Sequence, residues 1–393
     1  MGSDPGTHDL RLDRAEPIAS APRYCSAYGR TPMDRATVDI YERSAAAYAE
    51  RRRARQPGRA RAFAASVPAG TVRVDLGSGP GHYLPHLGRP VVAMDAAPAM
   101  LAEARRRHPG VPAVACDLEA LPFRRGAVGG IWASRSLQHI GAEALPLAAA
   151  GFHRVLSVGG VLDVTVFAGE GARRSGPDND FPGRLFTWWQ PEALHDLLVG
   201  AGFEPDELCL APTRRESAHA WLVARARRAR TLPDTVGPGM RLLMCGLNPS
   251  LYAADAGVGF ARPGNRFWPA VLAAGLVSVD RDPDHALRHH GIGMTDIVKR
   301  ATVAADELTT AEYRSGLARI ERLVRWLRPR SICFVGLAGW RAAVDRRAQP
   351  GRQSRGLAGV PVYVMPSTSG LNARTSLDEL TTHLREAAAA VRN

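Results

Sequence analysis

The sequence is almost devoid of lysine. Lys299 is the only lysine among 51 Lys and Arg residues, and every other one is arginine. An arginine side chain keeps its proton at neutral pH and cannot act as an amine nucleophile. Covalent chemistry through an amine is therefore limited to Lys299 and the N-terminus.

Cysteines and long apolar runs are also scarce. The five cysteines are scattered and never form a Cys-x-x-Cys pair, which argues against a disulfide framework and against a zinc site. No segment approaches the roughly 20 apolar residues of a membrane span. The N-terminal residues lack the apolar core of a signal peptide. We therefore expect a cytoplasmic protein that has no metal site and does not bind membranes.

Positive charge is present in excess. The formal net charge is +13 and the sequence pI is about 10.3. Residues 231–393 hold 21 Lys and Arg against 14 Asp and Glu, so both halves of the chain are basic. An excess of this size favours anionic partners, although it says nothing about the fold.

The 393 residues suit two domains, and the apolar pattern predicts two α/β units in succession. Strand-like and helical segments alternate in each, which predicts a mostly parallel sheet covered by helices. The strands predicted in the first unit are 72–76, 91–95, 113–117, 129–134 and 161–167. In the second unit, strands are predicted within 241–249, 331–339 and 360–367, and helices over 311–329 and 377–391.

An arginine run followed by Pro and Gly, over residues 224–240, is typical of a linker. No internal repeat relates the two halves. The predicted organisation is a flexible N-terminal segment over 1–37, a first domain over 38–228, a linker over 229–239 and a second domain over 240–393.

A glycine-rich loop follows the first predicted strand. The stretch "VDLGSGPGHY" places Gly77 and Gly79 at the strand tip, where glycine lets the backbone approach a ligand closely. Gly81 comes one residue earlier than in the dinucleotide-binding pattern, and His82 takes its place. A nucleoside-type ligand is predicted, with a tight turn that binds nothing as the alternative.

Two acids at strand ends strengthen the prediction of a nucleoside ligand. Asp95 ends the second predicted strand, where it can accept both ribose hydroxyls, and Asp117 ends the third, where it can receive an adenine amino group. Here the chain resembles the class I S-adenosylmethionine-dependent methyltransferases, through "VDLGSGPG", "AMDAAPAMLAEA", "CDLEALPF", "SLQHI" and "FHRVLSVGGVLDV" in that order.

The resemblance covers roughly residues 38–228 and implies a Rossmann-like sheet with S-adenosylmethionine as cofactor. The stretch "YERSAAAYAERR" (41–52) resembles the helix that folds over the cofactor in that group. The implied cofactor-binding residues are Asp75, Gly77, Gly79, Asp95, Ala96, Asp117 and Leu118. The methyl acceptor is not identified.

Three aromatic side chains of the first domain allow two interpretations. Trp188 and Trp189 could stack on a substrate, but a lid or core role is favoured. For His139 a structural role is likewise favoured over a role toward the acceptor. Methyl transfer depends on alignment more than on acid chemistry, because the sulfonium is a good leaving group. We therefore assign no catalytic base.

The second domain begins with an amide just past a buried strand, in "RLLMCGLNPS", with no acid beside it. Asn248 cannot act as a general base, but it can hold a water through its oxygen and donate through its NH₂ group. This suits hydrolysis of the N-glycosidic bond of uracil, because the base leaves as a stabilised anion and hydrogen bonds to its oxygens assist departure. Phe260 can stack on a base extruded from a duplex. Taken alone, Asn-Pro after a strand is usually only a turn.

Four motifs in register resemble the mismatch-specific uracil-DNA glycosylase and thymine-DNA glycosylase family: "GLNPS", "GFARPGNRFW", "GIGMTDIVKRAT" and "MPSTSGLNAR". The match spans about residues 238–392. It implies an α/β/α sandwich with a central parallel sheet, no cofactor, and duplex DNA with a G·U or G·T mispair as partner.

The resemblance also assigns roles to residues of the second domain. Asn248 is implied as the catalytic side chain, in a base pocket formed with Gly246, Leu247 and Phe260. Leu371 is implied as the wedge that fills the gap left by the flipped nucleotide, while Asn265 and Arg266 brace the pocket wall. The implied DNA-binding residues are Ser367, Ser369, Gly370, Leu371, Asn372 and Arg374.

Two positions depart from the family pattern or bear on specificity. Ser250 stands where the family has glycine, so its side chain is expected to narrow the pocket mouth. Ala253 is expected to leave room for 5-substituted uracils, and the choice between uracil, thymine and modified bases stays open. Because strand-cutting glycosylases need an amine, the single lysine predicts a monofunctional enzyme that leaves an intact abasic site.

The leading hypothesis is therefore a bifunctional fusion of a methyltransferase and a mismatch-type glycosylase, cytoplasmic and associated with the nucleoid during repair. One alternative makes the first domain an inactive binding module. Another makes methyl transfer to a small molecule or RNA the main activity, with the second domain as a DNA-binding module.

Overall fold

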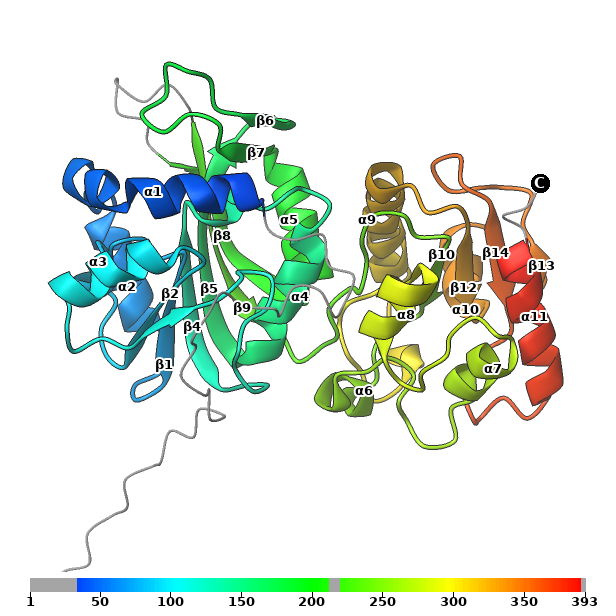
Figure 1. The fold of residues 1–393 in the computed structure, drawn as a ribbon. Helices are drawn as coiled ribbons and strands as arrows, with labels where there is room; N and C mark the ends of the chain where they lie inside the picture. The colour runs from blue at the N-terminus through cyan, green and yellow to red at the C-terminus, as the bar shows by residue number, and fades with distance from the viewer. Residues whose placement is uncertain (1–33, 212–219, 390–393) are drawn as a thin grey trace, which may run out of the picture.

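The computed structural model describes residues 34–211 and 220–389. Two α/β domains lie side by side, each with its own sheet (Figure 1). The predicted flexible segment over 1–37 lies mostly outside the described residues, and helix α1 begins at Arg35. None of the helices within the described ranges is both long and apolar enough to cross a membrane.

The first domain is built on a sheet in the order β3-β2-β1-β4-β5-β7-β6, with β9 also paired to β5 and β8 to β9. The strands are β1 Val72–Leu76, β2 Val91–Asp95, β3 Ala113–Ala115, β4 Val128–Ser134, β5 Leu156–Ala168, β6 Ala172–Arg174, β7 Leu185–Trp189, β8 Phe203–Ala211 and β9 Trp221–Arg228. Strands β1 to β5 are parallel, which confirms the five strands and the mostly parallel sheet predicted for this domain, although β3 ends two residues early. Strands β6 to β9 were not predicted.

The arginine-rich start of the predicted linker is part of a strand. Residues 224–228 belong to β9 and pair antiparallel with β5. Ala224 and Ala226 are buried, while Arg225 between them forms an ion pair with Asp163 at 2.9 Å. Small apolar and charged residues alternate here with the period of two that a strand requires. The prediction of a linker was therefore wrong for residues 224–228.

Helices cover both faces of the first sheet. They are α1 Arg35–Arg51, α2 Pro57–Ser66, α3 Pro98–Arg107, α4 Leu145–Val155 and α5 Pro191–Gly200. On one face, Phe152 of α4 packs with Leu76 and Ile131 in the main core cluster, and on the other Phe63 of α2 packs with Trp132. Helix α1 crosses the end of the sheet rather than a face (Figure 1).

The second domain has a sheet in the order β11-β10-β12-β14-β13. Its strands are β10 Leu242–Gly246, β11 Ile292–Asp296, β12 Ile332–Val335, β13 Gly351–Arg352 and β14 Val362–Met365. Its helices are α6 Leu251–Ala256, α7 Phe267–Ala273, α8 Pro283–His290, α9 Thr310–Leu327, α10 Ala338–Ala343 and α11 Leu377–Ala389. All strand pairs are parallel except the short β13–β14 pair.

Successive residues of β10 bury on opposite faces of this sheet, as a strand requires. Leu243 lies in one core cluster with Ile320 of α9 and Trp340 of α10. Met244 lies in another with Trp268 of α7 and Leu384 of α11. The predicted three-layer sandwich is therefore confirmed.

The segment joining the domains is packed against the second one. Leu232, Asp234 and Val236 are buried, and Thr235 exchanges two backbone hydrogen bonds with Met294 of β11, at 2.9 and 2.8 Å. The domains also touch directly.

Two contacts join α5 and the strand before it to α9. The Arg322 guanidinium of α9 donates to Asp196 of α5 at 2.5 and 3.0 Å, and Trp326 packs edge-on against Trp189 at 5.8 Å between ring centroids. The packed segment and these contacts hold the two domains as docked bodies.

The carboxyl ends of the two sheets point to opposite ends of the molecule. Helix α1, which covers the carboxyl ends of β1 and β2, lies at the top of Figure 1. Helix α6, which directly follows β10, lies at the bottom. Ligand sites in sheets of this kind lie beyond the carboxyl ends of the strands. The two candidate sites therefore open at opposite ends.

Candidate active sites

A pocket lies between α1 and the carboxyl ends of β1, β2 and β4 in the first domain. Five of the residues predicted to bind the cofactor line it: Gly77, Gly79, Asp95, Ala96 and Leu118. Asp75 and Asp117 do not line it: Asp75 is buried, and Asp117 uses one carboxylate oxygen to accept from the Glu119 amide at 2.8 Å. Tyr41 and Tyr48 of α1 also line the pocket with their aromatic rings. The sequence predicted only that this helix covers the cofactor.

The glycine loop is shaped by a close approach to the end of β4. Gly77 has a φ of 71°, and a Cβ atom added there would lie 2.3 Å from the Cβ of Ser136. Any larger residue would therefore displace the loop. Asp95 holds the same loop from the other side, because its two carboxylate oxygens accept from the amides of Gly79 at 2.8 Å and Ala97 at 2.9 Å.

Several polar groups beneath and along the pocket lack a partner among the described residues. Oδ2 of Asp75 and the hydroxyls of Ser134 and Ser136 are buried without a hydrogen bond. Burial, and to a lesser degree the neighbouring Asp95 carboxylate, raises the pKa of Asp75 to about 8. Buried polar groups normally have partners, so these orphaned atoms fit a polar or cationic ligand in the pocket.

The aromatic residues that allowed two interpretations have structural contacts. His139 is buried, with Nε2 2.8 Å from the Tyr41 hydroxyl and Nδ1 2.7 Å from the Leu185 carbonyl oxygen. Burial lowers the pKa of His139 to about 4, so the ring is neutral and both of its nitrogens are occupied. Trp188 stacks on Phe167 at 5.4 Å between ring centroids. Trp189 packs at the domain junction, as described above.

In the second domain, the side chain of Asn248 is held in one orientation. Its Nδ2 donates to the Thr302 hydroxyl at 2.8 Å, to the Arg300 carbonyl at 3.0 Å and to the Pro249 carbonyl at 3.2 Å. Within the described part of the chain, no residue donates to the Oδ1 atom. The NH₂ end is therefore anchored and the oxygen end is the one that can accept from a water.

Asp296 and Phe260 both approach Gly246 closely at the end of β10. A Cβ atom added to Gly246 would lie 2.3 Å from Oδ1 of Asp296 and 3.3 Å from Cζ of Phe260. The Phe260 ring stacks on the Phe267 ring, with 4.0 Å between the ring centroids and 17° between the ring planes. The backbone of Phe260 has a φ of 59°, in the left-handed region. The carbonyls of Gly246 and Leu247 accept from the amides of Ile297 and Val298, so they are tied to the neighbouring strand.

Asp296 is the residue that the sequence analysis missed. No acid is adjacent to Asn248 in the sequence, but one lies near it in the fold. Parallel pairing of β10 and β11 places Asp296, at the end of β11, opposite Gly246. Burial raises the pKa of Asp296 to about 6, against the lowering effect of Lys299. The sequence analysis predicted no strand over residues 292–296, so it gave no reason to place Asp296 opposite Gly246.

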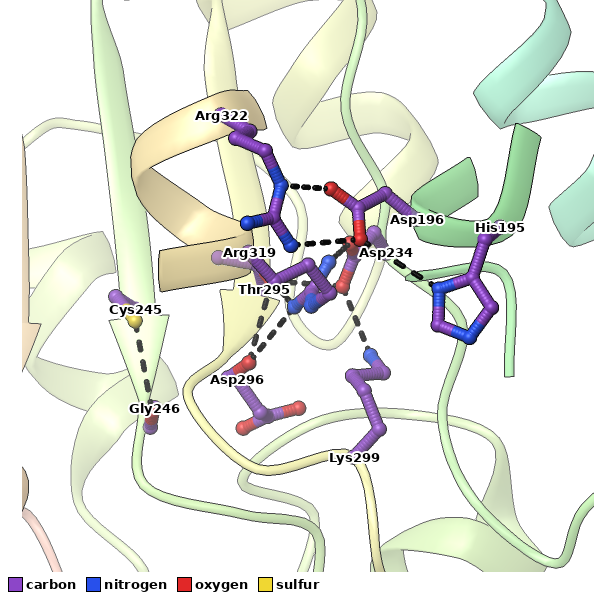
Figure 2. Close-up of polar contacts among 10 residues, drawn as sticks. All are labelled: His195, Asp196, Asp234, Cys245, Gly246, Thr295, Asp296, Lys299, Arg319 and Arg322. Carbon is purple, nitrogen blue, oxygen red and sulfur yellow. Dashed lines mark hydrogen bonds and ion pairs between the residues drawn. The ribbon is translucent and has the colours of Figure 1, made fainter. Parts of the chain in front are cut away.

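The two cations near Asp296 form ion pairs with another acid, Asp234. Lys299 and Arg319 both bond to the buried Asp234, at 2.8 and 2.6 Å, and Arg319 also donates to the Asp296 backbone oxygen at 3.0 Å (Figure 2). No dashed contact reaches the Asp296 carboxylate in Figure 2. The side chain of Lys299 is only 9% exposed. The one lysine of the chain is thus a buried structural cation.

Two family comparisons match separate parts of the chain. Residues 74–164 match the family described as "Methyltransferase domain", and residues 233–392 match the "Uracil DNA glycosylase superfamily". The chain joins a methyltransferase domain to a uracil DNA glycosylase superfamily domain.

Solved methyltransferase structures are similar to this chain. An S-adenosylmethionine-dependent methyltransferase from Methanosarcina mazei is 16% identical, with a TM-score of 0.38, over 43% of this chain and 97% of that chain. The 1,6-didemethyltoxoflavin-N1-methyltransferase of Burkholderia thailandensis, solved with S-adenosylhomocysteine, is 24% identical, with a TM-score of 0.39, over 56% of this chain and 98% of that chain. Both TM-scores lie below 0.5, so neither likeness identifies a methyl acceptor for this chain.

The loop after β14 in the glycosylase-superfamily domain is braced from within. Arg266 donates to the carbonyls of Asn372, at 2.5 Å, and Thr375, so its side chain braces this loop, and its role at the pocket wall stays a prediction. Asn372 donates to the Ser367 carbonyl at 2.8 Å and accepts from the Arg374 amide at 3.3 Å. Its amide therefore shapes the loop, and its contact with DNA stays a prediction.

The remaining loop residues leave one apolar side chain at the tip. Ser367 Oγ accepts from the Ser369 amide at 3.2 Å, and Ser369 Oγ accepts from the Leu371 amide at 3.3 Å. A Cβ atom on Gly370 would lie 2.9 Å from the Gly264 carbonyl oxygen, so the loop packs closely there. Leu371 is 88% exposed. An apolar side chain presented to solvent in this way suits an inserted wedge.

The expectation that the Ser250 side chain narrows the mouth of the base pocket was wrong. Its hydroxyl accepts from the Ala253 amide at 3.2 Å and caps the N-terminus of α6. The cap turns the side chain toward the helix instead of into the site, because the first amides of a helix lack partners of their own. Ala253 is buried within α6.

Proposed function

We propose that the second domain is a monofunctional DNA glycosylase. Its proposed substrate is uracil mispaired with guanine in duplex DNA, and thymine and 5-substituted uracils are the further bases to test. The observation that carries this proposal is the anchored Asn248 amide, whose oxygen is the free end, beside Gly246 and Phe260 at the carboxyl end of β10. Phe260 would stack on a base taken out of the helix, and Leu371 would fill the gap.

The reaction needs little acid or base chemistry from the protein. The C1′–N1 bond breaks with its electron pair leaving on the pyrimidine, and a water held by Asn248 Oδ1 adds to C1′. The proton released by that water passes to solvent. The glycosylase family match and the buried ion pair of Lys299 with Asp234 both support hydrolysis that leaves an intact abasic site.

We also propose that the first domain binds S-adenosylmethionine. The orphaned Asp75 and serine oxygens and the close-packed glycine loop fit a polar cofactor with a positive charge. When bound, the cofactor supplies a methyl group on a sulfonium. The glycine loop and Asp95 would hold the nucleoside part, with Tyr41 and Tyr48 of α1 as the cover.

The glycosylase proposal is tested by excision assays on duplexes with G·U, A·U and G·T pairs. We expect the wild-type protein to release uracil from G·U, and Asn248→Ala to lose at least about a hundredfold in rate, as for loss of a group that acts on the transition state. Asn179→Ala, which removes an amide of the first domain bonded to Arg184, is the control and should retain activity. A wild-type protein that leaves all three duplexes intact would refute the proposal.

The cofactor proposal is tested by calorimetric titration with S-adenosylmethionine. Binding that is lost in Asp95→Ala supports a working cofactor site, while no binding supports the alternative of an inactive module. Incubation of labelled cofactor with DNA, transfer RNA and a metabolite extract would then show where the methyl group goes.

A further inference from the structure

A loop of the methyltransferase domain lies against the glycosylase-superfamily domain close to its site. Arg125 lies in the turn that leads into β4, and its guanidinium touches Gly257, which caps the C-terminus of α6. A Cβ atom on Gly257 would sit 1.4 Å from Nη2 of Arg125. Gly257 lies three residues before Phe260, and three residues span at most about 11 Å even when extended. A cation of the first domain therefore lies near the proposed base site.

This loop lies at the end of the molecule where the glycosylase site opens. It precedes β4, so it lies at the amino end of the first sheet, opposite the cofactor pocket. Because the two sheets point in opposite directions, that edge lies at the bottom of Figure 1, next to α6. DNA seated on the glycosylase site would extend past this edge, because a duplex is longer than the site itself.

Two more arginines lie close by, and together with Arg125 we call them the junction arginines: Arg125, Arg228 and Arg230. Arg228 is buried, and its Nε has no hydrogen-bond partner among the described residues. Arg230 is half exposed and pairs with Asp255 at 2.5 Å. Arg125 is exposed, and it forms no hydrogen bond or ion pair with any residue in the described ranges.

Repulsion among these cations is only partly relieved within the protein. Burial lowers the pKa of Arg228, and the positive charge of Arg125 lowers it further, while Asp255 opposes the change. The same Arg125 charge acts in the same direction on Arg154, which Asp284 opposes, and on His153. Asp255 acts on both Arg228 and Arg230, and its carboxylate is already bonded to Arg230. An added anion would relieve the remaining repulsion.

We infer that the methyltransferase domain extends the DNA-binding surface of the glycosylase domain, with the exposed Arg125 bound to a backbone phosphate of the duplex beside the mispair. The inference rests on the proposed function. Arginine suits this role because its guanidinium can bind two phosphate oxygens at once and keeps its charge. Such contacts hold the duplex in register without reading its sequence.

This surface would give the methyltransferase domain a role in DNA binding by the fused chain. The methyltransferase domain supplies charge to DNA binding without its cofactor taking part, since the cofactor pocket opens at the other end.

The test measures the affinity of the full-length protein for DNA by fluorescence anisotropy between 50 and 200 mM salt. The probe is a duplex with a non-hydrolysable 2′-fluoro-deoxyuridine opposite guanine. Each phosphate contact contributes about 0.9 to the slope of log affinity against log salt. We expect Arg125→Ala to weaken binding and to lower that slope by about 0.9, and Arg125→Lys to keep the wild-type slope.

Arg43→Ala is the matched control. Arg43 is exposed on α1, at the opposite end of the molecule, and its loss removes the same charge. Its slope should equal that of the wild-type protein. Melting temperatures of all variants show that they are folded.

The outcomes separate this inference from the glycosylase proposal. If the wild-type protein binds the duplex and Arg125→Ala keeps its slope, or Arg43→Ala loses as much, the inference is overturned while the glycosylase stands. If the slope falls only in Arg125→Ala but no protein excises uracil, the surface stands and the glycosylase falls. A wild-type protein that fails to bind the duplex overturns both.

Discussion

At the scale of single residues, the two candidate sites rest on side chains whose partners are incomplete. The NH₂ group of Asn248 has three acceptors within hydrogen-bond distance for its two hydrogens, and the side-chain oxygen is left for a ligand. Asp75 is buried with one oxygen unpartnered. Asp296 reaches the end of β10 from the neighbouring strand, with its nearby cations bonded elsewhere. Such groups gain most from a bound partner, because a buried polar atom without one is costly.

Asp75 leads to a prediction on pH. Burial, and then the charge of Asp95, raises the pKa of Asp75 to about 8, above its ordinary value of 3.8. The stability linked to this group is therefore full below about pH 4 and is lost as pH rises through 8. A cationic cofactor favours the carboxylate, so we expect binding of S-adenosylmethionine to release a proton at pH 7 and to tighten between pH 6.5 and 9.

Calorimetry in buffers of different ionisation enthalpy measures that proton release. Asp75→Asn should bind without it and without the pH dependence, since the amide does not titrate. A wild-type affinity that is flat across this range would contradict the assignment.

At the scale of elements, α6 shows how a capping residue can be mistaken for a residue of the site. The first amides of a helix need acceptors, and Ser250 supplies one. Because Ser250 directly follows Asn248 and Pro249, the cap also helps to keep the turn that carries Asn248 in place.

We expect Ser250→Ala to destabilise the protein by about 1 kcal/mol, the usual cost of losing a helix cap, and Ser250→Gly by only a few tenths. Urea unfolding followed by fluorescence measures both. Ser250→Gly should also leave uracil excision within about twofold of wild type, because the hydroxyl faces the helix. A large gain in rate with glycine would instead mean that the serine obstructs the site.

At the scale of the whole molecule, the opposed directions of the two sheets separate the sites. The cofactor pocket lies under α1 and the Asn248 site lies near α6, at the other end (Figure 1). A nucleotide held in one site therefore cannot reach the other, even though α5 and α9 dock the domains through the Arg322–Asp196 pair.

This separation predicts independent catalysis. Saturating S-adenosylmethionine should change kcat/KM for uracil excision by less than about twofold, because no bound group passes between the sites. Steady-state excision assays with and without the cofactor measure this. A larger change would show that cofactor binding reaches the glycosylase site through the docked helices.

Strands β1 to β5 of the first domain and β10, β12 and β14 of the second were predictable, because their apolar residues repeat with the period of a strand. Strands β6 to β9 and β11 were not predicted. Asn248, Phe260 and the glycine loop at Gly77 were predictable for a related reason, since their motifs lie within one short stretch of chain each. Arg225 was harder, because a charge run and the outer face of β9 look alike until the partner Asp163 is known.

Sequence alone determined the strands that carry the glycine loop, Asp95 and Asn248, and that these motifs lie at the strand ends. Only the tertiary structure decided that Asp296 stands beside Gly246, that Ser250 caps a helix, and that Arg125 of one domain touches Gly257 of the other. The reason is physical: periodicity and turn chemistry act between neighbours in the chain, whereas strand pairing and domain docking join residues far apart in sequence. Those contacts depend on the packing of the whole molecule.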